Sequence, residues 1–253
     1  MPRSPKLVAF PHPKGGTGST SIVRDLGTAL AARRHPTLLV DLDPLCALSF
    51  SILDDAPART IADCLDGRAR LEEIAVETSQ KRLWLAPGSA RLQAWDRKPE
   101  RLSVDLARVL RQTPEEIEAV LLDLPAGMGV IVRTALALIP GGRLVAVLQP
   151  RPMDLAGLAD LFGLVEDLRD RNPDLAVRAI VATRTNRSAL CRDVLDALRR
   201  EHGPRLFPTV RESSLIARAP LRHRSVVETN PASGATEDVL ALARAFVAMV
   251  LRD

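Results

Sequence analysis

The sequence predicts an α/β domain whose doubly wound, mostly parallel sheet is flanked by helices. Short runs rich in Val, Leu and Ile alternate along the 253 residues with longer amphipathic patterns, which is typical of successive βα units. Several of the short runs are apolar without interruption, as expected of parallel strands that helices cover on both faces. No linker or change of composition divides the chain, so we expect residues 1–253 to form a single domain.

These patterns predict six strands and five long helices. The strands are Leu7–Pro11, Thr37–Leu42, Leu83–Ala86, Ala119–Leu124, Leu144–Gln149 and Val177–Thr183. The helices are Thr20–Arg34, Arg101–Gln112, Leu155–Arg171, Ala189–Glu201 and Thr236–Leu251. Ligands bind such a sheet at the carboxyl ends of its strands, so the residues that directly follow each strand are the candidates for function.

Cysteine usage and charge narrow the class of protein. Three widely separated cysteines suggest neither a disulfide framework nor a zinc site, and the first residues contain no apolar signal segment, so we expect a cytoplasmic protein without a membrane span. The net charge is +4, and residues 184–224 hold ten Arg against four acidic residues. Such a segment attracts nucleic-acid phosphates, although an Arg-rich composition with an ordinary solvated surface accounts for it equally well.

The ends of three strands carry the chemistry. After the first strand, residues 13–20 read P-K-G-G-T-G-S-T and lead into a helix, which is the geometry of a backbone cradle for phosphate, or else of a mere tight turn. Asp41 and Asp43 follow the second strand, and Asp123 ends the fourth. Carboxylates beside a phosphate loop hold Mg²⁺, directly or through water, and orient an attacking water. The three segments together favour a nucleotide site.

These segments resemble the ParA/Soj/MinD family of P-loop ATPases. K-G-G-T-G-S-T is similar to that family's deviant Walker A motif, V-D-L-D-P to its second acidic motif and L-L-D-L-P-A-G to its Walker B motif. Similarities at residues 60–65, 83–88, 166–174 and 217–220 extend the resemblance over nearly the whole chain. It implies a P-loop NTPase fold, ATP or ADP with Mg²⁺, and a homodimer formed on nucleotide binding.

The resemblance also implies a biological role. It favours the partition branch of the family over the membrane-anchored MinD branch, because no basic amphipathic anchor follows the last helix. Members of that branch bind DNA without sequence preference on the nucleoid, act in plasmid or chromosome segregation, and are regulated by a ParB-like centromere-binding partner.

The family roles map onto individual residues of this chain. Lys14 matches the signature lysine that reaches the partner subunit's nucleotide, and Asp43 matches the acid that positions the hydrolytic water. Thr20 matches the hydroxyl that ligates Mg²⁺, with Asp41 and Asp123 around the metal. The residues implied to bind the nucleotide are Lys14, Gly15, Gly16, Thr17, Gly18, Ser19 and Thr20.

The DNA contacts implied by the resemblance come from late arginines. They are Arg187, Arg192, Arg218, Arg222 and Arg224. The chain departs from the family at Leu215, where many relatives are basic, and at Arg211-Glu212, where the family reads Pro-Arg near the base. The first departure bears on the DNA contacts and the second on the adenine pocket.

The loop departs from the usual phosphate-loop pattern at two positions. Pro13 takes the first glycine slot, and Ser19 takes the slot of the lysine that places a positive charge on the β and γ phosphates. The neutral hydroxyl of Ser19 forms a hydrogen bond about half as strong as the charge-assisted bond of a lysine, so we expect slow hydrolysis of ATP.

Several explanations of Ser19 are open. Lys14, Arg24, Arg151 or Arg211 supplies the missing charge; or the protein is a scaffold or regulator that binds nucleotide without hydrolysing it; or residue 19 is a substitution that traps a bound state. A metal-cluster relative is disfavoured, because no paired interface cysteine is present.

Overall fold

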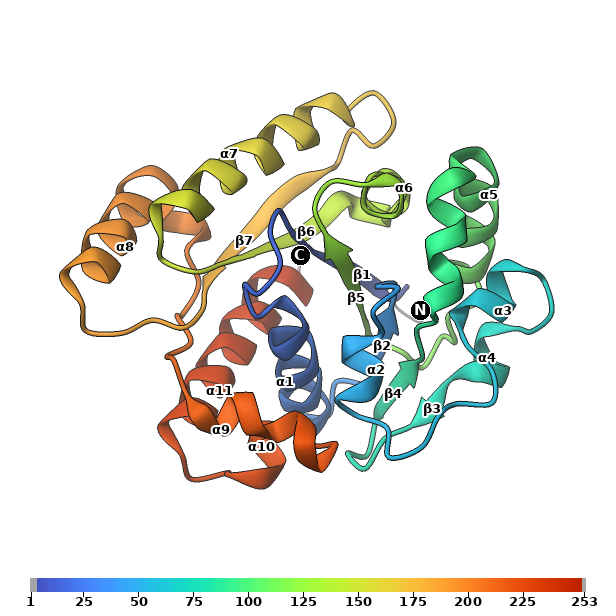
Figure 1. The fold of residues 1–253 in the computed structure, drawn as a ribbon, viewed down its shortest axis with the longest axis horizontal. Coiled ribbons are helices and arrows are strands. Elements are labelled where there is room, and N and C mark those ends of the chain that lie inside the picture. The colour runs from blue at the N-terminus through green and yellow to red at the C-terminus, as the bar shows by residue number, and fades with distance from the viewer. Residues whose placement is uncertain (1–3, 252–253) are drawn as a thin grey trace.

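The computed structural model describes residues 4–251 as a seven-stranded sheet with helices on both faces (Figure 1). The order of strands across the sheet is β3-β4-β2-β5-β1-β6-β7. All neighbouring strands are parallel except β3, which runs antiparallel to β4. The strands are β1 (Lys6–His12), β2 (Thr37–Asp41), β3 (Val76–Glu77), β4 (Leu83–Ala86), β5 (Ala119–Ala126), β6 (Arg143–Leu148) and β7 (Ala176–Ala182).

Helices connect the strands and cover the sheet. They are α1 (Ser19–Ala32), α2 (Ala47–Phe50), α3 (Ile61–Leu65), α4 (Leu71–Ile74), α5 (Pro99–Leu110), α6 (Val130–Leu138), α7 (Pro152–Asp167), α8 (Ala189–His202), α9 (Ser214–Arg218), α10 (Val226–Thr229) and α11 (Gly234–Phe246). Short 3₁₀ segments occupy Ala90–Arg97, Pro140–Gly142, Gly203–Arg205 and Ala219–Arg222, and a π-helical turn at Val247–Leu251 follows α11. Within residues 4–251, no helix has the length and apolarity that a bilayer crossing requires.

The alternation of side chains along each strand builds two hydrophobic cores. On β1, Leu7 and Ala9 face one core while Val8 and Phe10 face the other, because successive residues of a strand point to opposite faces. The first core lies under α5, α6, α7 and α8, and the second under α1 and α11. Figure 1 shows α1 and α11 side by side on their face of the sheet. The continuously apolar strands are therefore explained by burial on both faces.

The structure confirms the predicted fold class and the positions of all six predicted strands, and it corrects several details. The sequence reasoning missed β3, a two-residue edge strand too short to show a periodic pattern, and it missed α6, whose apolar run carries little polar contrast. The predicted last helix ends at Phe246 and continues as a π-helical turn. Helix α7 begins earlier than predicted because Pro152 fits the first helical turn.

The topology places a crevice beside β1. The helix after β1 covers one face of the sheet, whereas the helix after the neighbouring strand β6 covers the other. Such a switch in direction leaves a gap outside the carboxyl ends of the two strands, where ligands of doubly wound sheets bind. The loop of residues 13–18 lies at this gap.

Candidate functional site

The loop between β1 and α1 has the backbone of an anion cradle. Gly16 and Gly18 have φ angles of 81° and 88°, in the left-handed region that glycine adopts without strain. Among residues 4–251, no acceptor receives the backbone N–H groups of Lys14 to Gly18. Free N–H groups at the amino end of a helix of 14 residues are arranged to bind a negatively charged group.

Side chains from two neighbouring strands hold the loop in this conformation. Gln149, directly after β6, donates from Nε2 to the carbonyl of Gly16 at 2.6 Å. Thr183, directly after β7, donates from Oγ1 to the carbonyl of Thr17. Because the carbonyl groups are bound from outside the loop, the N–H groups are left to point inward. The cradle is thus fixed before any ligand arrives.

The two ends of the loop place their side chains differently. Lys14 is exposed and forms no ion pair within residues 4–251. Ser19 is buried, and its hydroxyl donates to the carbonyl of Phe10 at 3.2 Å. The hydroxyl of Ser19 is therefore hydrogen-bonded to strand β1 and does not point into the phosphate cradle. Lysine at this position would place a cation where the structure has none.

Asp123 is a fully buried carboxylate without a hydrogen-bond partner among the described residues. Burial raises its pKa well above the usual value, and the charge of Asp41 raises it further, while the nearby hydroxyl of Thr20 has a smaller opposite effect. Asp41 and Asp123 are direct neighbours in the β2–β5 register, so two buried acids lie side by side at one edge of the sheet. An unpaired buried carboxylate is costly unless a cation binds it.

Asp41 is also fully buried, but its oxygens are engaged. Oδ2 accepts from the Ser49 hydroxyl at 2.6 Å and from the Ser49 N–H at 2.9 Å, and Oδ1 accepts from the Asp43 N–H at 3.1 Å. Ser49 in turn accepts from the Gly88 N–H at 2.8 Å. Through these hydrogen bonds, Asp41 connects α2 and the loop after β4 to the end of β2. Its main effect on Asp123 is that of a second negative charge.

Asp43 and His12 border the same edge. Asp43 accepts one hydrogen bond, from the Leu45 N–H to Oδ1 at 2.8 Å, and its other oxygen has no donor within residues 4–251. His12 ends β1, is only 6% exposed, and has an unpartnered Nδ1. Burial lowers the pKa of His12, and the backbone of Phe10 and the charge of Asp43 oppose this only in part. A neutral imidazole and a free carboxylate oxygen therefore flank the cradle.

The shifted acids predict an unusual dependence of stability on pH. Burial raises the pKa of Asp41 from 3.8 to about 6, so the folded protein binds a proton that the unfolded chain has lost. The contribution of Asp41 to the free energy of unfolding is present at about pH 4 and is lost as the pH rises through about 6. A shift of this size corresponds to about 3 kcal/mol. His12, with its lowered pKa, has the opposite effect near pH 6.

Urea unfolding of the ligand-free protein between pH 4 and 7 measures this effect. Both forms keep His12, so the difference between the wild type and Asp41→Asn reports the titration of Asp41 together with its effect on the pKa of Asp123. We expect the wild type to lose stability relative to Asp41→Asn as the pH rises. A constant difference would show that Asp41 has an ordinary pKa.

Two of the arginines considered as replacements for the missing lysine are engaged elsewhere. Arg24 is buried in α1 and forms an ion pair with Asp25 at 2.8 Å, with both side chains 1% exposed. Arg211 forms a two-pronged ion pair with Asp238, at 2.6 and 2.8 Å. Arg151 is exposed just before α7, without an ion pair among the described residues. The structure thus leaves Lys14 and Arg151 available.

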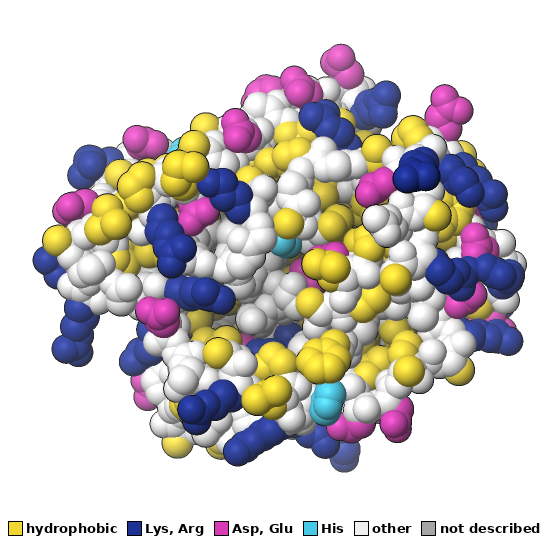
Figure 2. All heavy atoms as spheres, in the orientation of Figure 1, with side chains coloured by type: hydrophobic (Ala, Val, Ile, Leu, Met, Phe, Trp, Pro, Cys, Tyr) yellow, Lys and Arg dark blue, Asp and Glu magenta, His cyan; other side chains and the backbone are white. Residues whose placement is uncertain are grey.

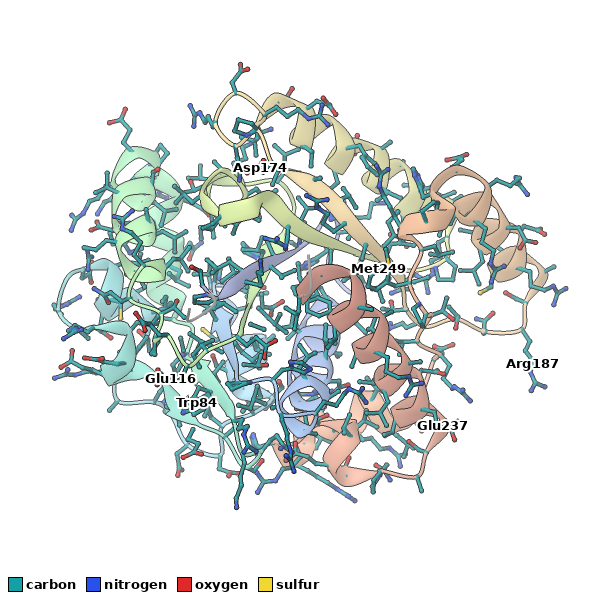
Figure 3. The ribbon with its side chains drawn as sticks, turned by 180° about the vertical axis from the view of Figure 1, so that it is seen from behind. Trp84, Glu116, Asp174, Arg187, Glu237 and Met249 are labelled. Atoms are coloured by element: carbon teal, nitrogen blue, oxygen red, sulfur yellow. The ribbon has the colours of Figure 1, made fainter. Side chains whose placement is uncertain are left out.

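Four of the five arginines suggested for DNA binding fall into two groups, and Arg224 lies apart from both. Arg187 lies in the loop before α8, where Figure 3 shows it pointing outward, and its carbonyl accepts from Arg192 at 2.6 Å. Arg218 and Arg222 line one depression at α9 and the following 3₁₀ turn. Arg224 instead borders a depression with Asp54, Asp55 and Glu77. Figure 2 shows basic side chains on both sides of the hollow in this face.

Sequence reasoning missed four residues that shape the site. They are His12, Ser49, Gln149 and Thr183. Gln149 and Thr183 were included only as the last residues of predicted strands. The signal that identified the aspartates, a polar side chain where a buried strand ends, also marks His12, Gln149 and Thr183. Ser49 carries no such signal, because its role depends on how α2 folds back over β2.

Comparisons with known proteins agree with this site. A family model described as an AAA domain matches residues 5–177, which is more than half of the chain. The chain is 28% identical over 259 residues to the chromosome partitioning protein ParA of Caulobacter vibrioides, covering 96% of this chain and 94% of that protein.

Two solved structures share the fold. A substituted McdA of Cyanothece in complex with ATP has a TM-score of 0.82 and 17% identity, covering 99% of this chain and 98% of that chain. The septum site-determining protein MinD of Pyrococcus horikoshii, complexed with Mg-ADP, has a TM-score of 0.77 and 22% identity, covering 95% of each chain. At these identities the two structures establish the fold. With the matching family model and the similarity to ParA along nearly its whole length, the chain belongs to the AAA-domain family of ParA/MinD-type P-loop ATPases.

Proposed function

We propose that this chain binds ATP or ADP with Mg²⁺ at the phosphate loop and acts as a nucleotide-dependent dimer switch in DNA partition. One observation supports the site above all others. Of the six buried side-chain atoms without a hydrogen-bond partner in residues 4–251, five surround the loop, on His12, Thr17, Asp123 and Gln149. Buried polar atoms are rarely left unpaired in native proteins, so their gathering at one place indicates a polar ligand.

Asp123 and Thr20 fit a divalent cation. Asp123 offers two free buried oxygens, and the hydroxyl of Thr20 lies nearby in the first turn of α1. Oxygen ligands of this kind suit Mg²⁺, which supplies charge neutralisation for the β and γ phosphates. Asp41, whose oxygens are held by Ser49 and the Asp43 N–H, acts in this proposal through its charge and through water.

The remaining residues act on the nucleotide and the water. The N–H groups of Gly15, Gly16, Thr17, Gly18 and Ser19 bind phosphate oxygens. The free oxygen of Asp43 accepts a hydrogen bond from the water that attacks the γ-phosphorus, with ADP as the leaving group. Lys14, exposed at the rim, reaches the nucleotide of a second copy of the chain. Without a cation at Ser19, this hydrolysis is slow.

The relative from Caulobacter supports a role in partition, since it is a chromosome partitioning protein. On this proposal the nucleotide-bound homodimer binds DNA on the nucleoid, in the cytoplasm, through phosphate contacts that carry no sequence information. A ParB-like centromere-binding partner stimulates its release. The arginines proposed for this surface are Arg187, Arg192, Arg218, Arg222 and Arg224, of which Arg224 is the weakest candidate because it borders three acidic residues.

Charge reversal of Arg187 together with Arg222 is expected to abolish retention of the ATP-bound protein on DNA. The two side chains belong to the two separate arginine groups, so both groups lose their attraction for phosphates, which should leave no salt-dependent binding. Retention on non-specific duplex DNA at increasing salt concentrations measures this. Reversal of Arg33 and Arg111, two exposed arginines away from these groups, serves as the control. Unchanged retention of the Arg187/Arg222 variant would exclude this surface.

A second function is favoured by the hydrogen bond of Ser19. Because its hydroxyl is bound to Phe10, the loop binds phosphate without stabilising charge that develops during hydrolysis. On this alternative, the chain serves as a scaffold or regulator that dimerises when it binds ATP but does not hydrolyse it. Light scattering with and without ATP and Mg²⁺, combined with phosphate release, separates the two functions. Dimers with slow release support the switch, dimers without release support the scaffold, and monomers throughout would contradict both.

A further inference from the structure

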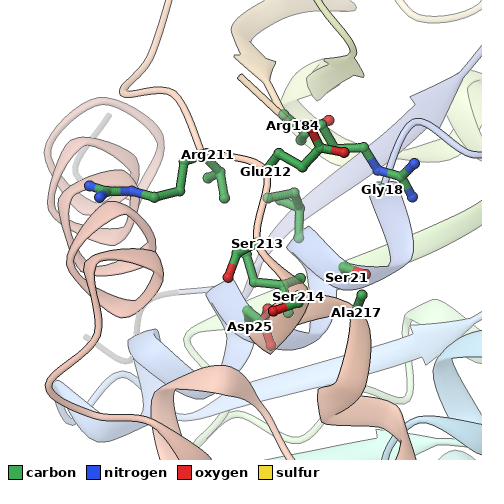
Figure 4. Close-up of a pocket in the computed structure, with 13 residues that line it drawn as sticks. Gly18, Ser21, Asp25, Arg184, Arg211, Glu212, Ser213, Ser214 and Ala217 are labelled. Carbon is green, nitrogen blue, oxygen red and sulfur yellow. The ribbon is translucent and has the colours of Figure 1, made fainter. Parts of the chain in front are cut away.

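The cavity beside the phosphate loop contains a basic side chain that the family motifs do not account for. This cavity has a volume of about 410 Å³ and is lined on one side by Gly18 and Ser21 of the loop and α1. Thr183 and Arg184, after β7, and residues 210–214, 216 and 217 line the other side (Figure 4). We propose that Arg184 binds the α-phosphate of the nucleotide and so supplies binding charge that the loop itself lacks. This inference rests on the proposed nucleotide site.

The backbone of Arg184 has a conformation that residues other than glycine rarely adopt. Its φ angle is +49°, in the left-handed region, which is unfavourable for a residue other than glycine. Both neighbours are fixed: Thr183 donates from its N–H to Leu148 at 2.8 Å, and Thr185 donates to Val210 at 3.2 Å. Figure 4 shows the side chain extending from the end of β7 toward Gly18. Local strain that the surrounding structure maintains is typical of functional positions.

The guanidinium of Arg184 is free to bind a ligand. It forms no ion pair or hydrogen bond with any residue of the described part of the chain, including Glu212, which lines the same cavity. The cavity's other acid, Asp25, is already paired with Arg24. Arg211, which also lines the cavity, is bound to Asp238. Arg184 is therefore the one arginine of this cavity without a protein partner in residues 4–251.

The position of the cavity determines which part of the nucleotide Arg184 meets. The acids proposed to meet the metal and the water, Asp123 and Asp43, do not line it, and neither does Lys14. The γ-phosphate belongs beside those acids, so the cavity at Gly18 and Ser21 receives the sugar end of the nucleotide, with the α-phosphate at its entrance. Arg184 therefore increases the affinity for ATP and ADP alike and does not stabilise the charge that builds on the γ-phosphate during hydrolysis.

Calorimetric titration with ATP and with ADP, in Mg²⁺ and without DNA, tests the assignment. Arg184→Met keeps the length of the side chain and removes its charge, and it is expected to weaken the binding of both nucleotides by the same factor, about tenfold or more. Arg184→Lys should recover part of the affinity. Arg178→Met changes an exposed arginine on β7 that lies outside the cavity, and this matched control should bind as the wild type does.

The Arg184→Gly variant distinguishes a role of Arg184 in nucleotide binding from a role in the stability of the fold. Glycine suits the positive φ angle, so this variant should keep or raise its melting temperature while it loses affinity. Two results would overturn the assignment: wild-type affinity in Arg184→Met, or a loss confined to ATP, which would place the guanidinium at the γ-phosphate. If the wild type itself binds neither nucleotide, the proposed nucleotide site fails, and the assignment of Arg184 fails with it.

Discussion

Replacement of Asp123 by asparagine is expected to abolish the Mg²⁺-dependent part of nucleotide binding and, at the same time, to stabilise the ligand-free protein. Asp123 is fully buried, has no hydrogen-bond partner in residues 4–251 and lies beside Asp41. In the proposed complex it would hold the cation, directly or through water. Without the cation, it is a buried acid whose raised pKa shows that the fold disfavours its charge.

The two effects have separate magnitudes and separate measurements. Asparagine has nearly the same shape but no charge, so it removes the cost of a buried negative charge beside Asp41. In a domain of this size each kcal/mol shifts the melting temperature by about 2–4 °C. Calorimetry of the ligand-free Asp123→Asn protein should therefore show a melting temperature several degrees higher. Titration with ATP should give the same affinity with and without Mg²⁺, and phosphate release should fall by about a hundredfold or more.

The control for this variant is Asp160→Asn, which changes an exposed carboxylate on α7. It should leave both stability and nucleotide affinity as they are in the wild type. If Asp123→Asn retained Mg²⁺-dependent binding, the cation would have to be held by other residues. If it lowered the melting temperature, Asp123 would be a structural residue in the ligand-free fold.

Introduction of lysine at position 19 is expected to raise the rate of ATP hydrolysis by about a hundred- to a thousandfold, equivalent to about 2.7–4 kcal/mol. Ser19 begins α1 at the end of the cradle, and its hydroxyl is bound to Phe10. An ammonium group at this position would stabilise the charge that develops on the β and γ phosphates. Single-turnover phosphate release measures the chemical step without interference from product release.

Ser19→Ala is the matched control for this substitution. It removes only the hydrogen bond to Phe10, so it should cost about 0.5–1.5 kcal/mol of stability and leave nucleotide affinity and turnover unchanged. Lower affinity in Ser19→Ala would show that the hydroxyl turns toward phosphate when nucleotide binds. Equal turnover in the wild type and a folded Ser19→Lys protein would contradict the role assigned to this position.

The sequence was sufficient to predict the fold class and the strands that carry the site. Leu38, Leu39 and Val40 are apolar in succession because both faces of β2 are buried, and this pattern identifies the strand without any structure. The glycines of the loop were equally informative, since the positive φ angles of Gly16 and Gly18 match the turn that the motif requires. Edge strands such as β3 were not predictable, because two residues are too few to show the alternation of apolar and polar side chains that identifies a strand.

The chemistry of individual side chains required the structure. The sequence placed Asp41 and Asp123 together at the metal, but only the folded chain shows that Ser49 occupies the oxygens of Asp41 while those of Asp123 remain free. Likewise, the sequence could not separate the buried Arg24 from the free Arg184. Which partner a charged side chain finds depends on contacts between distant segments, and a local pattern does not record such contacts.

Calorimetric titration of the purified wild-type chain with ATP, with and without Mg²⁺, is the most direct measurement of the central claim. The free N–H groups of the loop and the free oxygens of Asp123 predict one saturable nucleotide site per chain, with higher affinity in the presence of Mg²⁺. If neither ATP nor ADP produced saturable binding at millimolar concentration, the polar atoms around the loop would serve another ligand, and the proposed switch would be wrong.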